Sequence, residues 1–378
     1  MSIVTRSGAE VDADLSFLRS TQANATGTVA DADLTVVDLF SGCGGLTIGA
    51  LEGAARAGRR GALALAVDHD ERPLAVLRST LNVTGHEIVT ADLGSVLGGF
   101  SEVPRISELE LFKGVRDVSL LLAGPPCQGH SALNNHTRHD DPRNDLYIAV
   151  ARAAQLLEPA AVIIENVRSV GADRRGSMAR CASFLQELGY AVVQDRIDLT
   201  RTGAPQRRIR HVLIATRSRP LEWAWPDRAE RSVGWAIGDL LDAPSVSVFD
   251  TPSRPTPTNR KRIEWLIAND VHNLPNSKRP ACHSNGHSYL SMYGRLWWDR
   301  PAQTITSGFG SMGQGRFVHP LRPRTLTPHE AARLQFLPDF IDFSDVQHRG
   351  ALATMIGNAA PPSLTISLVQ ALCEQAAI

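Results

Sequence analysis

The stretch that decides the fold is Leu34-Thr-Val-Val-Asp-Leu-Phe-Ser-Gly-Cys-Gly-Gly45. Its first seven residues are apolar or β-branched apart from one carboxylate, which predicts a buried strand. The glycine-rich turn leads directly into a helical stretch from Leu46 to Ala57. A strand, a glycine-rich turn and a helix form the nucleotide-binding opening of a Rossmann-like α/β sheet, where glycines let the backbone approach a ligand closely.

The turn at 41–45 differs from the G-x-G-x-x-G spacing of dinucleotide-binding turns, and no phosphate-binding lysine follows it. A cofactor without phosphates is therefore favoured over a dinucleotide or a nucleoside triphosphate. A nicotinamide-dependent enzyme becomes a distant alternative for the same reason.

Further apolar runs predict more strands of the same sheet, and two of them end in a carboxylate. Asp68 ends the run 62–67 and Asp92 ends the run 88–92. A carboxylate at the end of the second strand is placed to bind ribose hydroxyls. Asp68 could instead cap the helix that starts near Pro73, and Asp92 could be a strand end that faces water. The remaining predicted strands are 118–123, 161–167, 192–199 and 211–216.

A cysteine follows the strand 118–123, in the loop Gly124-Pro-Pro-Cys-Gln-Gly-His-Ser131. Ligand sites of open α/β sheets lie at the carboxyl ends of strands, so Cys127 is well placed for a nucleophile. The alternative is a proline-rich turn with an incidental thiol. The polar stretch 136–145 builds no core and is interpreted as a lid beside this loop, or else as plain surface.

Two other segments carry candidate chemistry. Glu165 ends the apolar strand 161–167, where an apolar setting raises a carboxyl pKa and suits a proton donor; the alternative is a glutamate that points into water. Alternation in the strand period would place Gln206, Arg208 and Arg210 on one face. Guanidinium groups there could hold a phosphate or a base edge, or could form a solvated basic hairpin.

Length and composition indicate a soluble globular protein with two domains, or with one large α/β domain that carries an insertion. The 378 residues carry a formal net charge of zero, with five scattered cysteines that form no C-x-x-C pair. This favours a reducing cytoplasm and argues against a zinc site, so we expect no metal. No signal peptide and no membrane span are apparent. After Arg217, interleaved basic and aromatic residues suit a nucleic-acid surface or an irregular core.

Six segments, in order, resemble motifs of the cytosine-C5 DNA methyltransferase family, over almost the whole chain from Asp38 to about Gln370. The first three are the first cofactor motif at 38–45, the nucleophile motif at 124–128 and the catalytic glutamate motif at 165–167. The last three are the Gln-x-Arg-x-Arg motif at 206–210, a late helix at 324–335 and a last motif at 357–359. The late helix also has a capping box, formed by Thr327 and Glu330.

The resemblance implies an α/β fold: a Rossmann-like class I methyltransferase domain with a mixed, mostly parallel sheet, and a smaller irregular target-recognition domain. It implies a catalytic domain of 34–216 plus 350–378 and a recognition domain of 217–349. Residues 1–33, rich in Ala, Asp, Ser and Thr, are interpreted from their composition as a flexible leader with a short helix near 15–19. The implied cofactor is S-adenosylmethionine. Its implied ligands are Phe40, Ser41, Gly42, Gly44, Asp68, His69, Asp92, Leu93, Pro125, Leu146, Asn358 and Ala359.

The implied chemistry is addition of the Cys127 thiolate to carbon 6 of a flipped-out cytosine, with Glu165 protonating N3 and with Arg208 and Arg210 steadying the base. The substrate would be double-stranded DNA, in restriction-modification, orphan methylation or phage defence. A cognate endonuclease or a defence-system protein could be its partner. The enzyme is expected to be a monomer in the cytoplasm of a bacterium, associated with the nucleoid when bound to DNA. Implied DNA contacts are Gln128, Ser131, Arg143, Gln206, Thr304 and Thr306, the last two flanking Ile305.

The chain departs from the family pattern at several positions. His130 stands where phenylalanine is common, His69 where a bulky aromatic often covers adenine, and Ala360 where valine is usual; the first helix is also longer, around 55–61. We expect these changes to adjust packing around the cofactor. Two rival functions remain: a tRNA cytosine methyltransferase, and a DNA-binding regulator that has lost catalysis.

Overall fold

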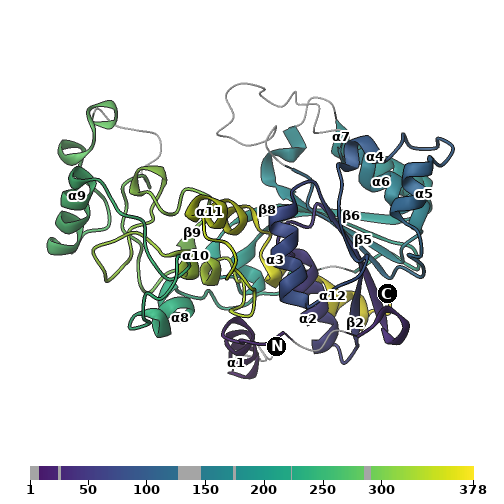
Figure 1. Cartoon of the computed structure of the whole chain (residues 1–378), viewed down its shortest axis with the longest axis horizontal. Coiled ribbons are helices and arrows are strands. Elements are labelled where there is room, and N and C mark those ends of the chain that lie inside the picture. The colour runs from purple at the N-terminus through teal and green to yellow at the C-terminus, as the bar shows by residue number, and fades with distance from the viewer. Residues whose placement is uncertain (1–7, 24–26, 127–145, 173–175, 223, 285–290) are drawn as a thin grey trace, which may run out of the picture. The chain divides into compact units, whose positions relative to one another are not determined.

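The computed structural model describes residues 8–23, 27–126, 146–172, 176–222, 224–284 and 291–378 (Figure 1). The chain divides into two compact units. The sheet unit comprises Ala23–Thr202, Ile209–Pro226 and Ala360–Ile378, and the loop unit comprises Met1–Gln22, Gly203–Arg208 and Asp227–Ala359. The first ten residues of the predicted catalytic segment 350–378 thus group with the loop unit.

A seven-stranded sheet in the order β3-β2-β1-β4-β5-β8-β6 forms the centre of the sheet unit. Neighbouring strands from β3 to β5 are parallel, whereas β8 runs antiparallel to both β5 and β6. This mixed, mostly parallel sheet confirms the predicted fold class. The strands are β1 (Leu34–Leu39), β2 (Gly61–Asp68), β3 (Ile88–Thr90), β4 (Leu120–Ala123), β5 (Ala161–Val167), β6 (Ala191–Asp198) and β8 (Ile209–Thr216).

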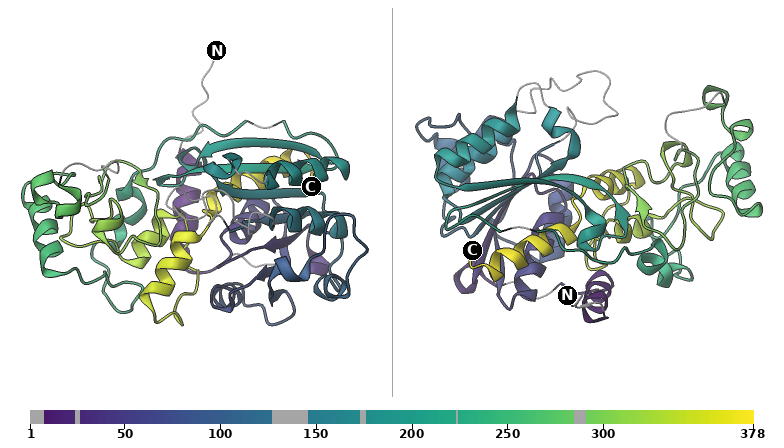
Figure 2. Two further views of the ribbon diagram at one scale, coloured as in Figure 1. Left: turned by 90° about the horizontal axis from the view of Figure 1, so that it is seen from above. Right: turned by 180° about the vertical axis from the view of Figure 1, so that it is seen from behind.

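Helices cover both faces of the sheet, which is why β1 and β4 are apolar on both sides and buried along their length (Figures 1 and 2). On one face lie α2 (Gly45–Arg56), α3 (Glu71–Leu81) and α12 (Pro362–Glu374). On the other lie α4 (Leu93–Val96), α6 (Leu146–Leu157) and α7 (Ser177–Glu187), with the short α5 (Ile106–Leu111) beyond them.

A buried ion pair ties α5 to α6. The Arg152 guanidinium donates two hydrogen bonds to the Glu108 carboxylate, Nε to Oε1 and Nη2 to Oε2, each 2.8 Å long. Glu108 also accepts from the backbone N–H groups of Gly98 and Arg105, at 2.7 and 2.8 Å. The Arg152 bonds, offset in part by burial, hold the pKa of Glu108 down at about 2.

The loop unit has short elements joined by long irregular segments. Its helices are α1 (Gly8–Leu18), α8 (Val233–Ile237), α9 (Pro257–Ala268), α10 (Pro328–Leu334) and α11 (Arg349–Asn358), and its strands are β7 (Gln206–Arg207) and β9 (Ala302–Gln303). Thr327 and Glu330 form the predicted capping box of α10. The proline-rich stretch 251–258 leads into α9, which begins at Pro257 with Thr256 as its N-cap.

The expectation of a loosely ordered leader fails for the end of α1. Asp14, Phe17 and Leu18 are buried, because Asp14 pairs with Arg228 at 2.9 Å and Phe17 stacks on Phe336. The helix begins earlier than the predicted 15–19, and it is part of the packing of the loop unit.

Short 3-10 turns lie in both units. Those described are Val29–Asp31, Arg168–Ala172, Leu199–Thr202, Gly238–Leu240, Asn276–Lys278, Ala281–His283 and Met312–Gln314.

Candidate active site

The turn after β1 has the backbone of a ligand cradle. Phe40, Gly42 and Gly44 all have positive φ angles, of 61°, 53° and 87°. A Cβ added to Gly44 would overlap the side chain of Leu77, and one added to Gly45 would overlap the carbonyl oxygen of Ala360. Close packing against backbone therefore requires glycine at 45, and the positive φ angles favour glycine at 42 and 44, although space is open at Gly42.

Two buried oxygens at this turn have no hydrogen-bond partner within the described residues: Ser41 Oγ and Asp38 Oδ1. Asp38 is fully buried, and its other oxygen accepts a 2.5 Å hydrogen bond from the Thr47 hydroxyl. Burial raises the pKa of Asp38 to about 7, against the Thr47 bond, and the charge of Asp68 raises it further. Unpartnered acceptors in such a cradle fit a ligand that brings hydrogen-bond donors or positive charge.

Three polar residues at the end of β2 and just after it, Asp68, His69 and Asp70, have different partners. Asp70 is the N-cap of α3 and accepts from the Arg72 N–H at 3.1 Å. Asp68 is consequently not used as the cap; it is 9% exposed and accepts from the Gly42 N–H at 2.9 Å. His69 Nδ1 lies 3.0 Å from Asp68, with three quarters of the His69 side chain exposed.

The strand β3 and the helix α6 bring two more predicted cofactor residues together. Asp92 caps α4 through a 3.0 Å bond from the Gly94 N–H, so this side chain is a helix cap and not a plain strand end. A Cβ at Gly94 would lie 3.2 Å from Leu146 Cδ2 and 3.3 Å from Asp92 Oδ1. Asp92 and Leu146 therefore flank one backbone position, and Leu93 beside them is buried.

The segment that leads to the cysteine loop is held from the neighbouring strand. Asn166 Nδ2 donates to the carbonyl oxygen of Pro125 at 3.0 Å, and both residues are buried. This bond is possible because β4 and β5 are adjacent and parallel, with Ala123 opposite Ile164. Asn166 thus fixes the backbone two residues before Cys127.

Glu165 has a charged partner and not the apolar setting that the sequence predicted. Its Oε1 lies 2.6 Å from Arg210 Nε, and about a tenth of each side chain is exposed. The pairing follows from the antiparallel register of β5 and β8, in which Arg210 lies opposite Val167, two residues along the same face from Glu165. Arg210 therefore places a guanidinium directly beside the Glu165 carboxylate.

Burial alternates through the Gln-x-Arg-x-Arg segment as predicted: residues 206, 208 and 210 are buried, and 207 and 209 are exposed. Gln206 and Arg208 belong to the loop unit, where they bind the backbone of Ile305. Ile305 N–H donates to Gln206 Oε1 at 3.0 Å, and Arg208 Nη1 donates to the Ile305 carbonyl at 2.9 Å. A direct contact of Gln206 with DNA does not fit a fully buried side chain whose amide is engaged at both ends.

Comparison with known proteins decides the family. Residues 34–374 match the model of the C-5 cytosine-specific DNA methylase family. The chain belongs to this family. It is 40% identical to the Type II methyltransferase M1.BsuMI of Bacillus subtilis over 347 residues, which cover 89% of this chain and 79% of that protein. It is 28% identical to the Type II methyltransferase M1.HphI of Haemophilus parahaemolyticus, with 90% and 87% covered.

Solved structures share the fold of this cytosine-5 DNA methyltransferase. The Entamoeba histolytica methyltransferase EhMeth superposes with a TM-score of 0.63 at 16% identity, covering 91% of this chain and 98% of that one. The Schizosaccharomyces pombe Dnmt2 methyltransferase superposes with a TM-score of 0.58 at 16% identity, covering 91% and 99%. The family makes DNA the substrate and implies S-adenosylmethionine as the methyl donor.

Several predicted residues of the methyltransferase lie outside the described residues: Cys127, Gln128, His130, Ser131, Arg143 and the proposed lid. In the loop unit, Thr304 Oγ1 donates to the Arg207 carbonyl at 2.8 Å, and Thr306 Oγ1 accepts from the Gly308 N–H at 3.3 Å. Asn358 is exposed and Ala359 buried at the end of α11. No role was predicted for Asn166 or Gln335; the one signal available for them was their position within a motif.

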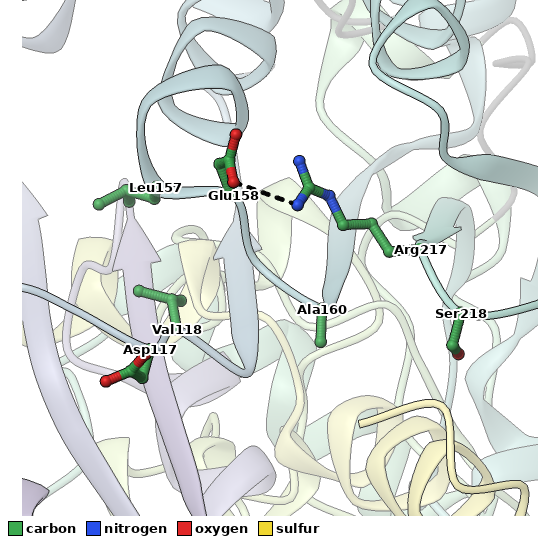
Figure 3. Close-up of a pocket in the computed structure, with 7 residues that line it drawn as sticks. All are labelled: Asp117, Val118, Leu157, Glu158, Ala160, Arg217 and Ser218. Carbon is green, nitrogen blue, oxygen red and sulfur yellow. Dashed lines mark hydrogen bonds and ion pairs between the residues drawn. The ribbon is translucent and has the colours of Figure 1, made fainter.

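A pocket of about 470 Å³ lies at the amino ends of the parallel strands, at the edge opposite the candidate active site (Figure 3). Asp117 and Val118 precede β4, and Glu158 and Ala160 precede β5, so the pocket adjoins the amino ends of these parallel strands. Its Glu158 and Arg217 pair with each other at 3.3 Å and are largely exposed. Ligand sites of such sheets lie at the opposite, carboxyl edge.

One stretch, Arg349–Glu374, is long and apolar enough to cross a membrane by length and composition. It consists of α11 and α12, and 78% of its most apolar window is buried inside the protein, as in the core helices of other folded proteins.

Proposed function

We propose that this enzyme methylates carbon 5 of a flipped-out cytosine in double-stranded DNA through a covalent bond between Cys127 and carbon 6. Family membership supports the reaction. The observation that carries the assignment of residues is the fixed edge at β4 and β5, where Asn166 holds the Pro125 carbonyl and Arg210 holds Glu165. Chain connectivity delivers Cys127 two residues after Pro125.

The chemistry requires each of these groups. Carbon 5 of cytosine is a weak nucleophile until a thiolate adds to carbon 6 and gives the ring enamine character. Cys127 supplies the thiolate, and Glu165 holds a proton at N3 to stabilise the adduct. Arg210 keeps the Glu165 carboxylate in place through their ion pair. A base removes the carbon-5 proton, after which the thiolate leaves.

Residues at the carboxyl edge of the sheet fit S-adenosylmethionine, which supplies the methyl group when bound. Ser41 and Asp38 offer unpartnered buried oxygens to a cationic ligand that carries an ammonium group. Asp68 would accept from the ribose hydroxyls, and Asp92 from the adenine amino group. The remaining cofactor residues are Phe40, Gly42, Gly44, His69, Leu93, Pro125, Leu146, Asn358 and Ala359.

DNA recognition is assigned to residues 217–349, with 34–216 and 350–378 as the catalytic domain. We assign DNA contacts to Gln128, Ser131 and Arg143 in the loop after the nucleophile, and to Thr304 and Thr306. Gln206 and Arg208 act indirectly, because they hold the backbone between these two threonines. A base buried in a duplex cannot reach a thiolate, so the cytosine must rotate out of the helix.

Bisulfite sequencing of DNA from cells that express the protein tests the reaction and identifies the target site. We expect methylated cytosines at one recurrent sequence. In parallel, labelled methyl transfer to duplex DNA and to tRNA separates the two substrate classes; transfer to tRNA alone would overturn the proposal.

The biological setting is restriction-modification, orphan methylation or phage defence, in the cytoplasm of a bacterium and on its nucleoid. A restriction endonuclease or defence-system protein is the proposed partner, and the enzyme is proposed to act as a monomer. The Type II names of the relatives support the first setting. A restriction site that becomes resistant to cleavage in expressing cells would support it directly.

A further inference from the structure

One buried side chain, Gln335, caps the end of α11. Its Nε2 donates to the carbonyl oxygens of Ile356 and Gly357, at 2.7 and 3.3 Å. The last carbonyls of a helix have no partner within the helix, so a side-chain donor there fixes where the helix stops. The chain leaves α11 at Asn358 and Ala359, both assigned above to the cofactor site. Gln335 is fully buried.

The same amide also reaches the segment assigned to DNA. Gln335 Oε1 accepts from Gln206 Nε2, and Gln206 Oε1 accepts from the Ile305 N–H at 3.0 Å. The parallel pairing of β7 with β9 ends at Gln303. Beyond Gln303, side chains make the hydrogen bonds that a neighbouring strand would make to Ile305. Gln206 accepts from the Ile305 N–H, and Arg208 donates to the Ile305 carbonyl oxygen.

The two segments also touch directly. A Cβ on Gly357 would overlap the backbone nitrogen of Ser307 and lie 2.5 Å from the carbonyl carbon of Thr306. Arg208 spans both, since its Nη1 bonds to the Ile305 carbonyl at 2.9 Å and its Nη2 to the Gly357 carbonyl at 3.4 Å. Neither segment can shift without breaking bonds to the other, because interiors this close-packed do not deform smoothly.

We infer that Gln335 is a positioning residue that links the turn 356–359 to the segment 304–306, so that binding of DNA and binding of the cofactor strengthen each other. The inference rests on the proposed function, which places one ligand on each segment. A ligand that holds either segment in its bound position would also hold the other through the two glutamines, and the second ligand then meets a prearranged site. The coupling acts in both directions by the same factor.

The test measures cofactor affinity with and without DNA, using S-adenosylhomocysteine to prevent turnover. The DNA is a 20-base-pair unmethylated duplex that carries the sequence found by bisulfite sequencing. For the wild type we expect DNA to tighten cofactor binding by about 5-fold or more, a usual size for coupled sites. Gln335→Met keeps the length of the side chain but loses all three of its hydrogen bonds, and should bring the ratio close to one.

Two controls separate positioning from general damage. Gln347→Met makes the same change at an exposed glutamine of the loop unit, which donates to the Ser344 carbonyl, and should keep the wild-type ratio. Gln335→Glu retains the acceptor for Gln206 but loses the donor to α11; if Gln335→Met fails to fold, this variant carries the test. In either variant, KM for the cofactor should rise more than kcat falls at saturation.

A folded Gln335 variant that keeps the wild-type ratio would overturn the inference, as would a wild type that binds both ligands with a ratio of one. A wild type that binds neither cofactor nor DNA would overturn the proposed function as well.

Discussion

The Glu108–Arg152 pair gives a stability prediction with a defined pH dependence. Both side chains are at most 1% exposed and share two hydrogen bonds. Glu108→Gln keeps the shape of the side chain but leaves the Arg152 charge without its counter-ion. Removing one partner of a buried pair costs about 3–5 kcal/mol. We expect a loss of that order in the free energy of unfolding at pH 7.

The sign of the pH dependence follows from the depressed pKa of Glu108, about 2 in the folded protein against an ordinary value of 4.5. The ionised carboxylate contributes stability above pH 4.5, and that contribution is lost as the pH falls toward 2. The shift corresponds to about 3 kcal/mol, of which about 2 kcal/mol is gone by pH 3. The stability difference between wild type and Glu108→Gln should therefore shrink by that amount between pH 7 and pH 3.

Urea unfolding followed by circular dichroism at several pH values measures this difference. Glu110→Gln is a matched control on the same helix, since the Glu110 side chain is 69% exposed and 3.9 Å from Lys113. It should change stability by less than about 0.5 kcal/mol. The reasoning is refuted if Glu108→Gln is as stable as wild type at pH 7, or if the difference between them does not depend on pH.

Three further predictions concern the site and its support. Asn166→Ala frees the Pro125 carbonyl, and should lower kcat by about tenfold or more with little change in cofactor affinity; an unchanged kcat would remove Asn166 from the site. Gly45→Ala forces a methyl group onto the Ala360 carbonyl and should cost about 3 kcal/mol of stability or prevent folding, read by thermal unfolding. Burial disfavours charged His329, but its hydrogen bonds to Asp339 and Asp250 outweigh this and raise its pKa, so the stability that it adds is present below pH 6.5 and lost as the pH rises. His329→Gln should abolish that loss in urea titrations between pH 6 and 9.

The sheet could be predicted because its strands are buried on both faces and therefore appear as continuous apolar runs. The run Leu34–Leu39, its glycine turn and the helix after it are found within one residue of their predicted bounds. The loop unit offered no such periodicity. The helix α9, with a basic N-terminal half, follows a proline-rich stretch, and α1 has little amphipathic periodicity.

The site was predictable in its residue types but not in their partners. The sequence placed Glu165 at a strand end, but its pairing with Arg210 depends on the register of β5 and β8, which are far apart in the chain. A DNA contact was expected for Gln206 because its motif resembles that of the methyltransferase family. Its burial arises from Gln335 and Ile305, residues 129 and 99 positions away, which no local pattern reveals.

The central claim is that Cys127 attacks cytosine, and trapping tests it most directly. Incubation of the enzyme with S-adenosylmethionine and duplex DNA containing 5-fluorocytosine at the target position should give a denaturation-resistant adduct, because fluorine at carbon 5 blocks the final elimination. The account predicts this adduct for the wild type and its absence in Cys127→Ser. An adduct that persists in Cys127→Ser would contradict the account.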